Sequence, residues 1–522
     1  MLRRPDTTTQ KVFLAFDLGA TSWRAILGRR GPAGLALEEV RRGRHAPRES
    51  SEGLFWDIQG LFDGMKGVLR DVASRGISLS CIGIDSWSVD YGLLDTNGAL
   101  LEPPRCYRDP RNRGMAARIA SLVGQRDLLA RTGLIAEDIT TLCQLAAARE
   151  KTPHLLQSAS SLLFIPDLLR YWLCGKRATD FTLATTSQMY SIVDNGWDDE
   201  LLSRLGIPPG ILPAILRGNS VLASLARDVQ AETGLGAVPI SIGTSHDTAA
   251  AFSTQPADDE AAILSSGTWS MLGIHMKQPL FLESIDPERF GYEGNPDGTV
   301  RLLCNIPGMY IMEQCRQAWQ KEHGDLSYET LIAGAEGIPS FSSRIDPYDS
   351  TFSLPGDIPE EIRRFCSRTG QQEPRTPFET ARAIFLGLAD TYAHALDELK
   401  KISGRSIRRI IVIGGGSRNA LLNRLIQERT GIEVRHGALS LCSAADREPV
   451  GVRKHDVQHD QVRPVAAQGG EKALAVAELP DAKAFLLQRG ADQGTNIVFV
   501  FDDGDELVHV ACASFHRKQE TR

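Results

Sequence analysis

Apolar runs that end in turn residues recur along the chain and predict β-hairpins. Residues 11–16 (KVFLAF) form an apolar run, 17–22 (DLGATS) form a polar turn, and the apolar pattern resumes over 23–28. This pattern predicts a hairpin whose glycine permits a tight turn. A similar unit follows halfway along, where the apolar run 261–264 leads into SSGTWS (265–270) and a second strand over 271–274. Two such units suggest a duplicated domain.

Between and after the hairpins, strand-like segments alternate with helix-like ones. Helical patterns cover 127–132, 166–173 and 377–399, and a strong strand over 410–413 is followed by a helix from about 419. This alternation predicts a mixed α/β architecture. The polar, turn-rich loop at 253–259 marks the expected domain boundary.

Bulk composition narrows the class of protein without identifying a reaction. A chain of 522 residues with 42% hydrophobic and 24% charged residues is expected to form two domains. The net charge of −7 argues against a nucleic-acid partner. The apolar runs are short and interrupted by charge, so neither a membrane span nor a secretory signal is expected. The nine cysteines are scattered without a CxxC pair, which is typical of reduced thiols in the cytoplasm.

The first hairpin turn combines a carboxylate with small hydrogen-bond donors. Asp17 ends the first strand and can hold Mg²⁺, which prefers carboxylate and phosphate oxygens. Gly19 permits a close backbone approach, and Ala20, Thr21 and Ser22 offer amides and hydroxyls to phosphate. The alternative is a plain surface turn.

The second candidate is a carboxylate where a strand gives way to a helix. Asp247 follows the apolar segment 238–242, at the sheet edge where α/β proteins bind ligands. There it can accept the proton of a sugar hydroxyl that attacks phosphorus. A Ser-His-Asp hydrolase is disfavoured, because adjacent residues point in different directions and no GxSxG elbow is present. The alternative for Asp247 is a helix N-cap.

The third candidate is the glycine run GGGSRN at 414–419, between a buried strand and a helix. Three glycines remove side chains so that a flat ligand or a phosphate can lie against the backbone. The run is neither GxGxxG nor a Walker sequence, which disfavours Rossmann and P-loop enzymes. Tight packing alone is the alternative.

The order of these motifs resembles that of the FGGY carbohydrate kinases. The resemblance covers residues 11–437 and includes DLGATS (17–22), IGIDSWSVDYG (82–92), YRDPR (107–111), SHDTA (245–249), SSGTWS (265–270) and GGGSRN (414–419). The DSWxVDYG and SHDTA pair is specific to the rhamnulokinase branch of that family. The resemblance implies two actin-like (ribonuclease H-like) ATPase domains, 11–253 and 254–437, which close on a ketose and ATP.

The resemblance also assigns roles on the sugar side. It implies that Asp247 is the catalytic base and that His246 and Thr248 lie beside it in the ketose site. Trp87 and Ser88 are expected to line that site, although the family commonly has glycine where Ser88 stands. The expected reaction is ATP-dependent phosphorylation of L-rhamnulose to L-rhamnulose 1-phosphate in L-rhamnose catabolism, with L-fuculose and L-xylulose as other candidate substrates.

On the nucleotide side, the resemblance places Ala20, Thr21, Ser22, Trp23 and Arg24 against the phosphates. Trp23 replaces a small residue that is customary in the family. Nucleotide-contacting positions of the family further match Thr268, Asn305, Glu313 and Gly415, and Glu313 stands where glutamine is common. ATP and Mg²⁺ are the expected co-substrate and metal ion.

After Gly437 the resemblance stops, and residues 438–522 form a divergent tail. The family continues with a Gly-Asn helix start that this chain lacks. Back-translating DREP (446–449) one base later permits Ile-Gly-Asn-Leu, so a frameshift is one hypothesis for the tail. Within it, 497–501 and 507–512 predict a β-hairpin. A second hypothesis for the whole chain is therefore a catalytically impaired, sugar-binding homologue.

Overall fold

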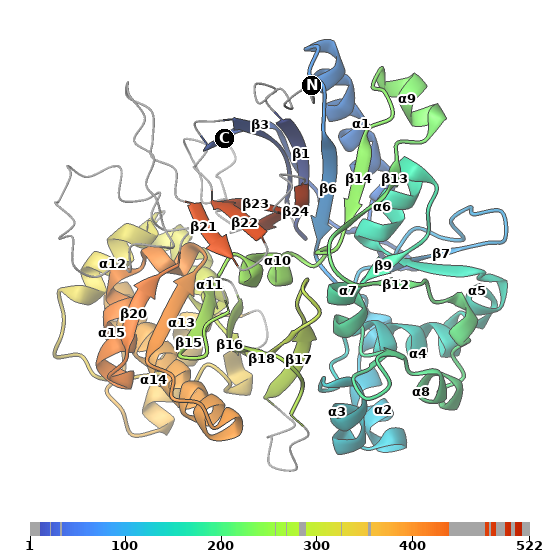
Figure 1. Ribbon diagram of the computed structural model, residues 1–522. Coiled ribbons are helices and arrows are strands. Elements are labelled where there is room, and N and C mark those ends of the chain that lie inside the picture. The colour runs from blue at the N-terminus through green and yellow to red at the C-terminus, as the bar shows by residue number, and fades with distance from the viewer. Residues whose placement is uncertain are drawn as a thin grey trace.

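The chain folds into two lobes that meet at helix α10, as the computed structural model shows (Figure 1). It describes residues 11–437 apart from Thr21, 32–33, Pro256, Thr268, 281–288, Asp325 and 353–355, together with the backbone of four strands between 476 and 513. A six-stranded sheet forms the centre of each lobe. This is the mixed α/β architecture that the sequence predicts.

The first sheet has the strand order β13-β14-β6-β1-β2-β3. Its strands are β1 (Lys11–Leu18), β2 (Ser22–Gly31), β3 (Gly34–Arg44), β6 (Cys81–Ser86), β13 (Ser220–Ser224) and β14 (Pro239–Ile242). Strand β1 is antiparallel to β2 and parallel to β6, and β14 is parallel to β6. The apolar side chains of these strands form one core with the helices α1 (Ile58–Ser74), α6 (Ile165–Cys174) and α9 (Arg227–Thr233).

A helical region with its own apolar core lies between β7 and β13. Its helices are α2 (Met115–Val123), α3 (Gln125–Thr132), α4 (Thr141–Lys151), α5 (Pro153–Ser158), α7 (Phe181–Thr186) and α8 (Asp199–Arg204). Short strand pairs of the first lobe are β4–β5 (Arg48–Ser50, Gly53–Phe55), β7–β8 (Tyr91–Leu94, Ser161–Phe164), β9–β12 (Thr179–Asp180, Ile215–Leu216) and β10–β11 (Tyr190–Ser191, Gly196–Trp197). The 3₁₀ turns are Pro110–Asn112 and Pro209–Ile211.

The second sheet has the strand order β17-β18-β16-β15-β19-β20. Its strands are β15 (Ala261–Ser266), β16 (Trp269–Met276), β17 (Phe290–Gly294), β18 (Val300–Pro307), β19 (Arg409–Ile413) and β20 (Glu433–His436). The helices of this lobe are α11 (Tyr310–His323), α12 (Tyr328–Glu336), α13 (Ile358–Arg368), α14 (Pro377–Ser403) and α15 (Ala420–Thr430), with 3₁₀ turns at Ser350–Phe352 and Gly415–Arg418. A capping box between Thr376 and Glu379 starts α14, the helix predicted over 377–399.

Five strands of each sheet repeat one topology, as a duplication of the kind that the hairpins suggest would produce. In each sheet a hairpin is extended by a third antiparallel strand on one side and by two parallel strands on the other. Strands β1, β2, β3, β6 and β14 thus correspond to β15, β16, β18, β19 and β20. The turn-rich loop proposed as the boundary lies between α10 (Asp247–Ser253) and β15.

Part of the tail forms a separate four-stranded antiparallel sheet. Its strands are β21 (Val476–Leu479), β22 (Ala482–Leu486), β23 (Asn496–Asp502) and β24 (Leu507–Ala513). Strands β23 and β24 are the hairpin predicted over 497–512, and that prediction is confirmed.

Candidate active site

Three parallel strands of the first sheet bring the sugar-side candidates to one edge. Asp17 near the end of β1 lies opposite Asp85 near the end of β6. The Ser86 N–H donates to the Ser245 carbonyl (2.9 Å), and the Trp87 N–H donates to the Leu18 carbonyl (3.3 Å). The hairpin turn, the loop after β6 and the loop before α10 are therefore joined at the carboxyl edge of the sheet, where ligands bind in α/β folds.

The first hairpin carries a buried ion pair. Arg24 Nη1 lies 3.1 Å from Asp17 Oδ2, and the two side chains are only 4% and 2% exposed. A buried carboxylate is stabilised by such a charged, hydrogen-bonded partner. Ala20 and Ser22 are half-buried beside this pair, and Thr21 lies outside the described residues.

Trp23 points into the core and not towards the carboxyl edge. A Cβ added at Gly43 would lie 2.3 Å from Trp23 Nε1, and one added at Gly64 would lie 2.9 Å from Trp23 Cζ2. Two glycines, one on β3 and one on α1, thus make room for the indole. The bulk of Trp23 therefore lies in the core and does not fill the hairpin turn.

Asp247 is the first residue of α10 and not its N-cap, so the N-cap alternative is wrong. Its Oδ1 accepts hydrogen bonds from the Thr248 N–H (2.5 Å) and from Thr248 Oγ1 (3.2 Å). The side chain keeps 25% exposure, and burial raises its pKa, while the neighbouring His246 lowers it to a lesser extent. A carboxylate with raised proton affinity and access to a ligand has the properties of a general base.

The loop before α10 is hydrogen-bonded to the helical region. Thr182 Oγ1 accepts hydrogen bonds from the Ser245 N–H (3.3 Å) and the His246 N–H (3.2 Å). Ser245 Oγ accepts from Arg170, which also donates to the Ile84 carbonyl at 2.9 Å. Ser245 therefore bonds to Arg170 on the side of α6 and does not form the triad of a hydrolase with its two neighbours.

Two residues from the second lobe reach this loop, and sequence reasoning missed both. Arg301, which is fully buried, pairs with Glu293 across strands β17 and β18. Arg301 Nη2 lies 3.4 Å from His246 Nδ1, Glu293 Oε2 lies 3.7 Å from the same nitrogen, and His246 Nε2 lies 3.5 Å from Asp247 Oδ1. Burial lowers the pKa of His246. The signal that could have found this network is the strand register, which the sequence pattern does not give.

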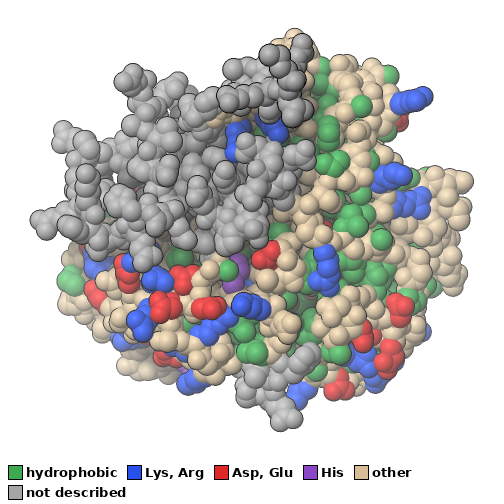
Figure 2. Space-filling view, viewed as in Figure 1, with side chains coloured by type: hydrophobic (Ala, Val, Ile, Leu, Met, Phe, Trp, Pro, Cys, Tyr) green, Lys and Arg blue, Asp and Glu red, His purple; other side chains and the backbone are tan. Residues whose placement is uncertain are grey.

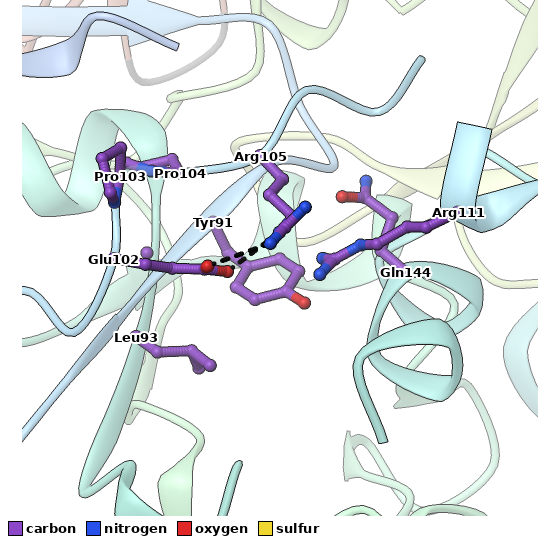
Figure 3. A pocket seen from close by; sticks show the side chains of 9 residues that line it. Tyr91, Leu93, Glu102, Pro103, Pro104, Arg105, Arg111 and Gln144 are labelled. Atoms are coloured by element: carbon purple, nitrogen blue, oxygen red, sulfur yellow. Dashed lines mark hydrogen bonds and ion pairs between the residues drawn. The ribbon is translucent and has the colours of Figure 1, made fainter. Parts of the chain in front are cut away.

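The expected ketose loop lies next to the base. Trp87 is buried, with Nε1 donating to Asp90 at 3.0 Å, and Ser88 is half-buried. Ser86, just before this loop, forms a β-bridge with His246, the neighbour of Asp247. Burial raises the pKa of Tyr107 to about 12. A small pocket behind this loop is lined by Tyr91, Arg105, Arg111 and Gln144 among others (Figure 3).

The nucleotide-side candidates lie on separate elements of the second lobe. Asn305 is an exposed residue of β18, and Gly415 begins the turn after β19. Glu313 lies in the first turn of α11, where Arg316 Nη1 donates to it at 3.0 Å and offsets its charge. Thr268 lies outside the described residues.

The glycine run packs closely on the second hairpin. Gly414 has a φ of +90°, a conformation that favours glycine. A Cβ added at Gly416 would lie 2.0 Å from Ser266 Oγ. The glycine run thus packs directly against Ser266 at this edge of the second sheet, where a side chain at position 416 would not fit.

The molecular surface carries both signs of charge. On the face shown in Figure 2, acidic and basic side chains are interspersed over the second lobe. Within the part of the chain that the structure describes, no helix has the length and apolar character needed to cross a bilayer. The same part holds no cluster of three or more histidine, cysteine or acidic side chains arranged for a metal ion.

Comparison with known proteins identifies both lobes. Residues 12–253 match the model for the N-terminal domain of the FGGY family of carbohydrate kinases, and residues 262–442 match the model for its C-terminal domain. A rhamnulokinase of Bacteroides thetaiotaomicron is 38% identical over 423 residues, which are 81% of this chain and 86% of that protein. A rhamnulokinase of Halalkalibacterium halodurans is 33% identical over 426 residues, 82% of this chain and 90% of that protein.

Solved structures share the fold at low identity. A gluconate kinase from Lactobacillus acidophilus superposes with a TM-score of 0.69 at 18% identity, over 82% of this chain and 85% of that one. A xylulose kinase from Rhodospirillum rubrum gives a TM-score of 0.69 at 19% identity, over 85% of this chain and 91% of that one. These likenesses show that the fold is that of a two-domain sugar kinase.

Proposed function

The chain belongs to the FGGY family of carbohydrate kinases, and from this premise we propose that it transfers the γ-phosphoryl group of ATP to L-rhamnulose. The two rhamnulokinases above, at 38% and 33% identity over four-fifths of the chain, support the choice of ketose. The product is then L-rhamnulose 1-phosphate, and the reaction serves L-rhamnose catabolism. Cytoplasmic location and the lack of a nucleic-acid partner stay predictions of the sequence.

Asp247 carries the proposal because it is a partly exposed carboxylate at the carboxyl edge of the first sheet. In the proposed step it takes the proton of the ketose hydroxyl while the hydroxyl oxygen attacks the γ-phosphorus. The bond to the bridging oxygen breaks, and ADP leaves with the electron pair. His246 and Thr248 hold Asp247 in place, and Trp87 and Ser88 line the ketose site.

The hairpin turns and the glycine run are proposed to hold the nucleotide. The backbone of Ala20 to Arg24 faces the phosphates, and Thr268, Asn305, Glu313 and Gly415 contact the rest of ATP. Closure of two lobes positions both substrates in line and excludes water, which is most of what phosphoryl transfer needs.

A divalent cation fits the residues present. Asp17 and Asp85 lie opposite each other in the parallel register of β1 and β6, and both are buried. Their oxygens are the hard donors that Mg²⁺ prefers, directly or through water. We propose Asp17 as the residue that holds it. When bound with ATP, Mg²⁺ neutralises charge on the phosphate oxygens.

The alternative of a sugar-binding homologue without turnover has no support among the described residues. Asp247, the Asp17–Arg24 pair and the glycine run are all present at the expected sheet edges. The longest departure from the family is the chain after Gly437, and most of it lies outside the described residues.

Replacing Asp247 tests the proposal. Asp247→Asn keeps the shape of the side chain and removes the base, so kcat should fall by roughly 10²–10⁴-fold while the ketose is still bound. The matched control is Asp228→Asn on the exposed face of α9, which should leave kcat unchanged. Near-wild-type turnover of Asp247→Asn would contradict the assignment of the base.

A further inference from the structure

Asp90 lies in the interior behind the ketose loop and receives hydrogen bonds from three other side chains. Its side chain is fully buried, between Trp87 and strand β7. Oδ2 accepts from Trp56 Nε1 at 2.6 Å and from Trp87 Nε1 at 3.0 Å, and Oδ1 accepts from Gln144 Nε2 at 3.0 Å. One carboxylate thereby ties together the segment before α1, the loop after β6 and helix α4.

The two indoles belong to an aromatic wall made of His45, Trp56 and Trp87. The ring centroids of Trp56 and Trp87 are 4.6 Å apart, and that of His45 lies 5.3 Å from each. His45 Nε2 lies 2.6 Å from the Gly19 carbonyl in the first hairpin turn. The aromatic wall thus extends from the proposed phosphate hairpin to the proposed ketose loop.

The hydrogen bonds select a carboxylate at position 90. Gln144 Nε2 also donates to the carbonyls of Val89 (3.2 Å) and Ile139 (2.9 Å), which fixes its amide with the N–H groups towards Asp90. Asp90 therefore faces donors on both of its oxygens. An asparagine there would turn its own N–H₂ group either to the indoles or to Gln144, and one contact would be donor against donor.

The backbone next to Asp90 is strained and firmly held. Val89 has a φ of +72°, which is rare for a β-branched residue. Its carbonyl accepts from Thr141 Oγ1 at 2.8 Å in addition to Gln144. Strain of this kind persists where the surrounding structure over-determines a conformation, which is common at ligand sites. Figure 3 shows Gln144 beside Arg111 at one side of the small pocket.

We infer that Asp90 is a positioning residue that locks Trp56 and Trp87 into a single wall against which the ketose packs. It thereby sets the affinity for the ketose and not the rate of phosphoryl transfer. The inference rests on the proposed function, because it takes Trp87 as part of the ketose site. Asp90 is separated from the substrate by the indoles, so it acts through them.

The test compares steady-state kinetics of Asp90→Asn with those of the wild-type chain. We expect the KM for L-rhamnulose to rise about tenfold, because one buried donor loses its acceptor. The kcat and the KM for ATP should stay within about twofold, since the base and the nucleotide side are untouched. The tryptophan emission of the free protein should also shift, because two indoles lose a fixed polar contact. Trp172→Phe, which changes a tryptophan outside the wall, is the control and should leave both KM values unchanged.

Two milder variants keep the test decisive if Asp90→Asn does not fold. Trp56→Phe and Gln144→Leu each remove one donor and should raise the KM for L-rhamnulose about threefold, again with kcat unchanged. An unchanged ketose KM in all three variants, or a loss confined to kcat, would overturn the inference while leaving the proposed function intact. Absence of ketose-dependent turnover in the folded wild-type chain would instead overturn the proposed function and the inference with it.

Discussion

The two sheets share the order of five strands but carry different chemistry where their parallel strands end. In the first sheet, Asp17 lies opposite Asp85 and pairs with Arg24, so that edge holds buried charges. In the second sheet, Ser265 lies opposite Ile413, and Ser266 meets Gly416, so that edge is neutral and open to the backbone. The topology determines at which edge of the sheet a ligand can bind, and the side chains at that edge determine its chemistry. In the proposed function, proton transfer and the phosphates of ATP belong to the first edge, and the rest of the nucleotide belongs to the second.

The largest effect is expected from breaking the charge pair at the first edge. Arg24→Met removes the cation opposite the buried carboxylate of Asp17 and should lower the free energy of unfolding by about 3–5 kcal/mol. Urea unfolding measures this. The double variant Asp17→Asn/Arg24→Met should recover most of the loss, because no isolated charge remains. If Arg24→Met lowers the free energy of unfolding by less than about 1 kcal/mol, the stability of this lobe does not depend on the Asp17–Arg24 pair.

A second effect of burying charge in the first lobe is pH-dependent. Burial raises the pKa of Asp90 from 3.8 to about 6, against the opposing effect of its hydrogen bonds. The native state therefore binds a proton more tightly than the unfolded state, so the Asp90 contribution to stability falls as pH rises. The unfolding free energy of the wild type, relative to Asp90→Asn, should drop by roughly 2.5 kcal/mol between about pH 4 and pH 7. If the difference in unfolding free energy between the wild type and Asp90→Asn does not change over this pH range, the pKa of Asp90 is not raised.

The smallest effect is expected at the neutral edge. Gly416→Ala places a methyl group 2.0 Å from Ser266 Oγ, so the glycine turn must move. The KM for ATP should rise roughly tenfold, with the ketose KM unchanged. The double variant Gly416→Ala/Ser266→Gly should relieve part of the loss. If Gly416→Ala raises the KM for the ketose and not the KM for ATP, the assignment of the nucleotide to the second edge is wrong.

Local patterns predicted the elements of both sheets well. The hairpins at Asp17 and Gly267, the strand before Gly414 and the helix over 377–399 are all present, because each depends on neighbouring residues alone. The strand order then follows from the family fold. The position of Asp247 at a sheet edge was predictable for the same reason.

Contacts between distant segments could not be predicted. Glu293 and Arg301 reach His246 only because β17 and β18 pair in a register that no local pattern specifies. Trp23 stands where the family has a small residue, and its place in the core depends on two distant glycines, Gly43 and Gly64, which make room for its ring. The frameshift hypothesis for the tail stays a prediction, which resequencing the gene around codon 440 decides.

The most direct test of the central claim is an ADP-release assay on the full chain with ATP, Mg²⁺ and a panel of ketoses. ADP release should depend on the sugar and be greatest with L-rhamnulose. One L-rhamnulose 1-phosphate should form for each ADP. L-Fuculose and L-xylulose should follow with lower kcat/KM. Failure of the folded chain to release ADP with any ketose, or release that is independent of sugar, would contradict the central claim.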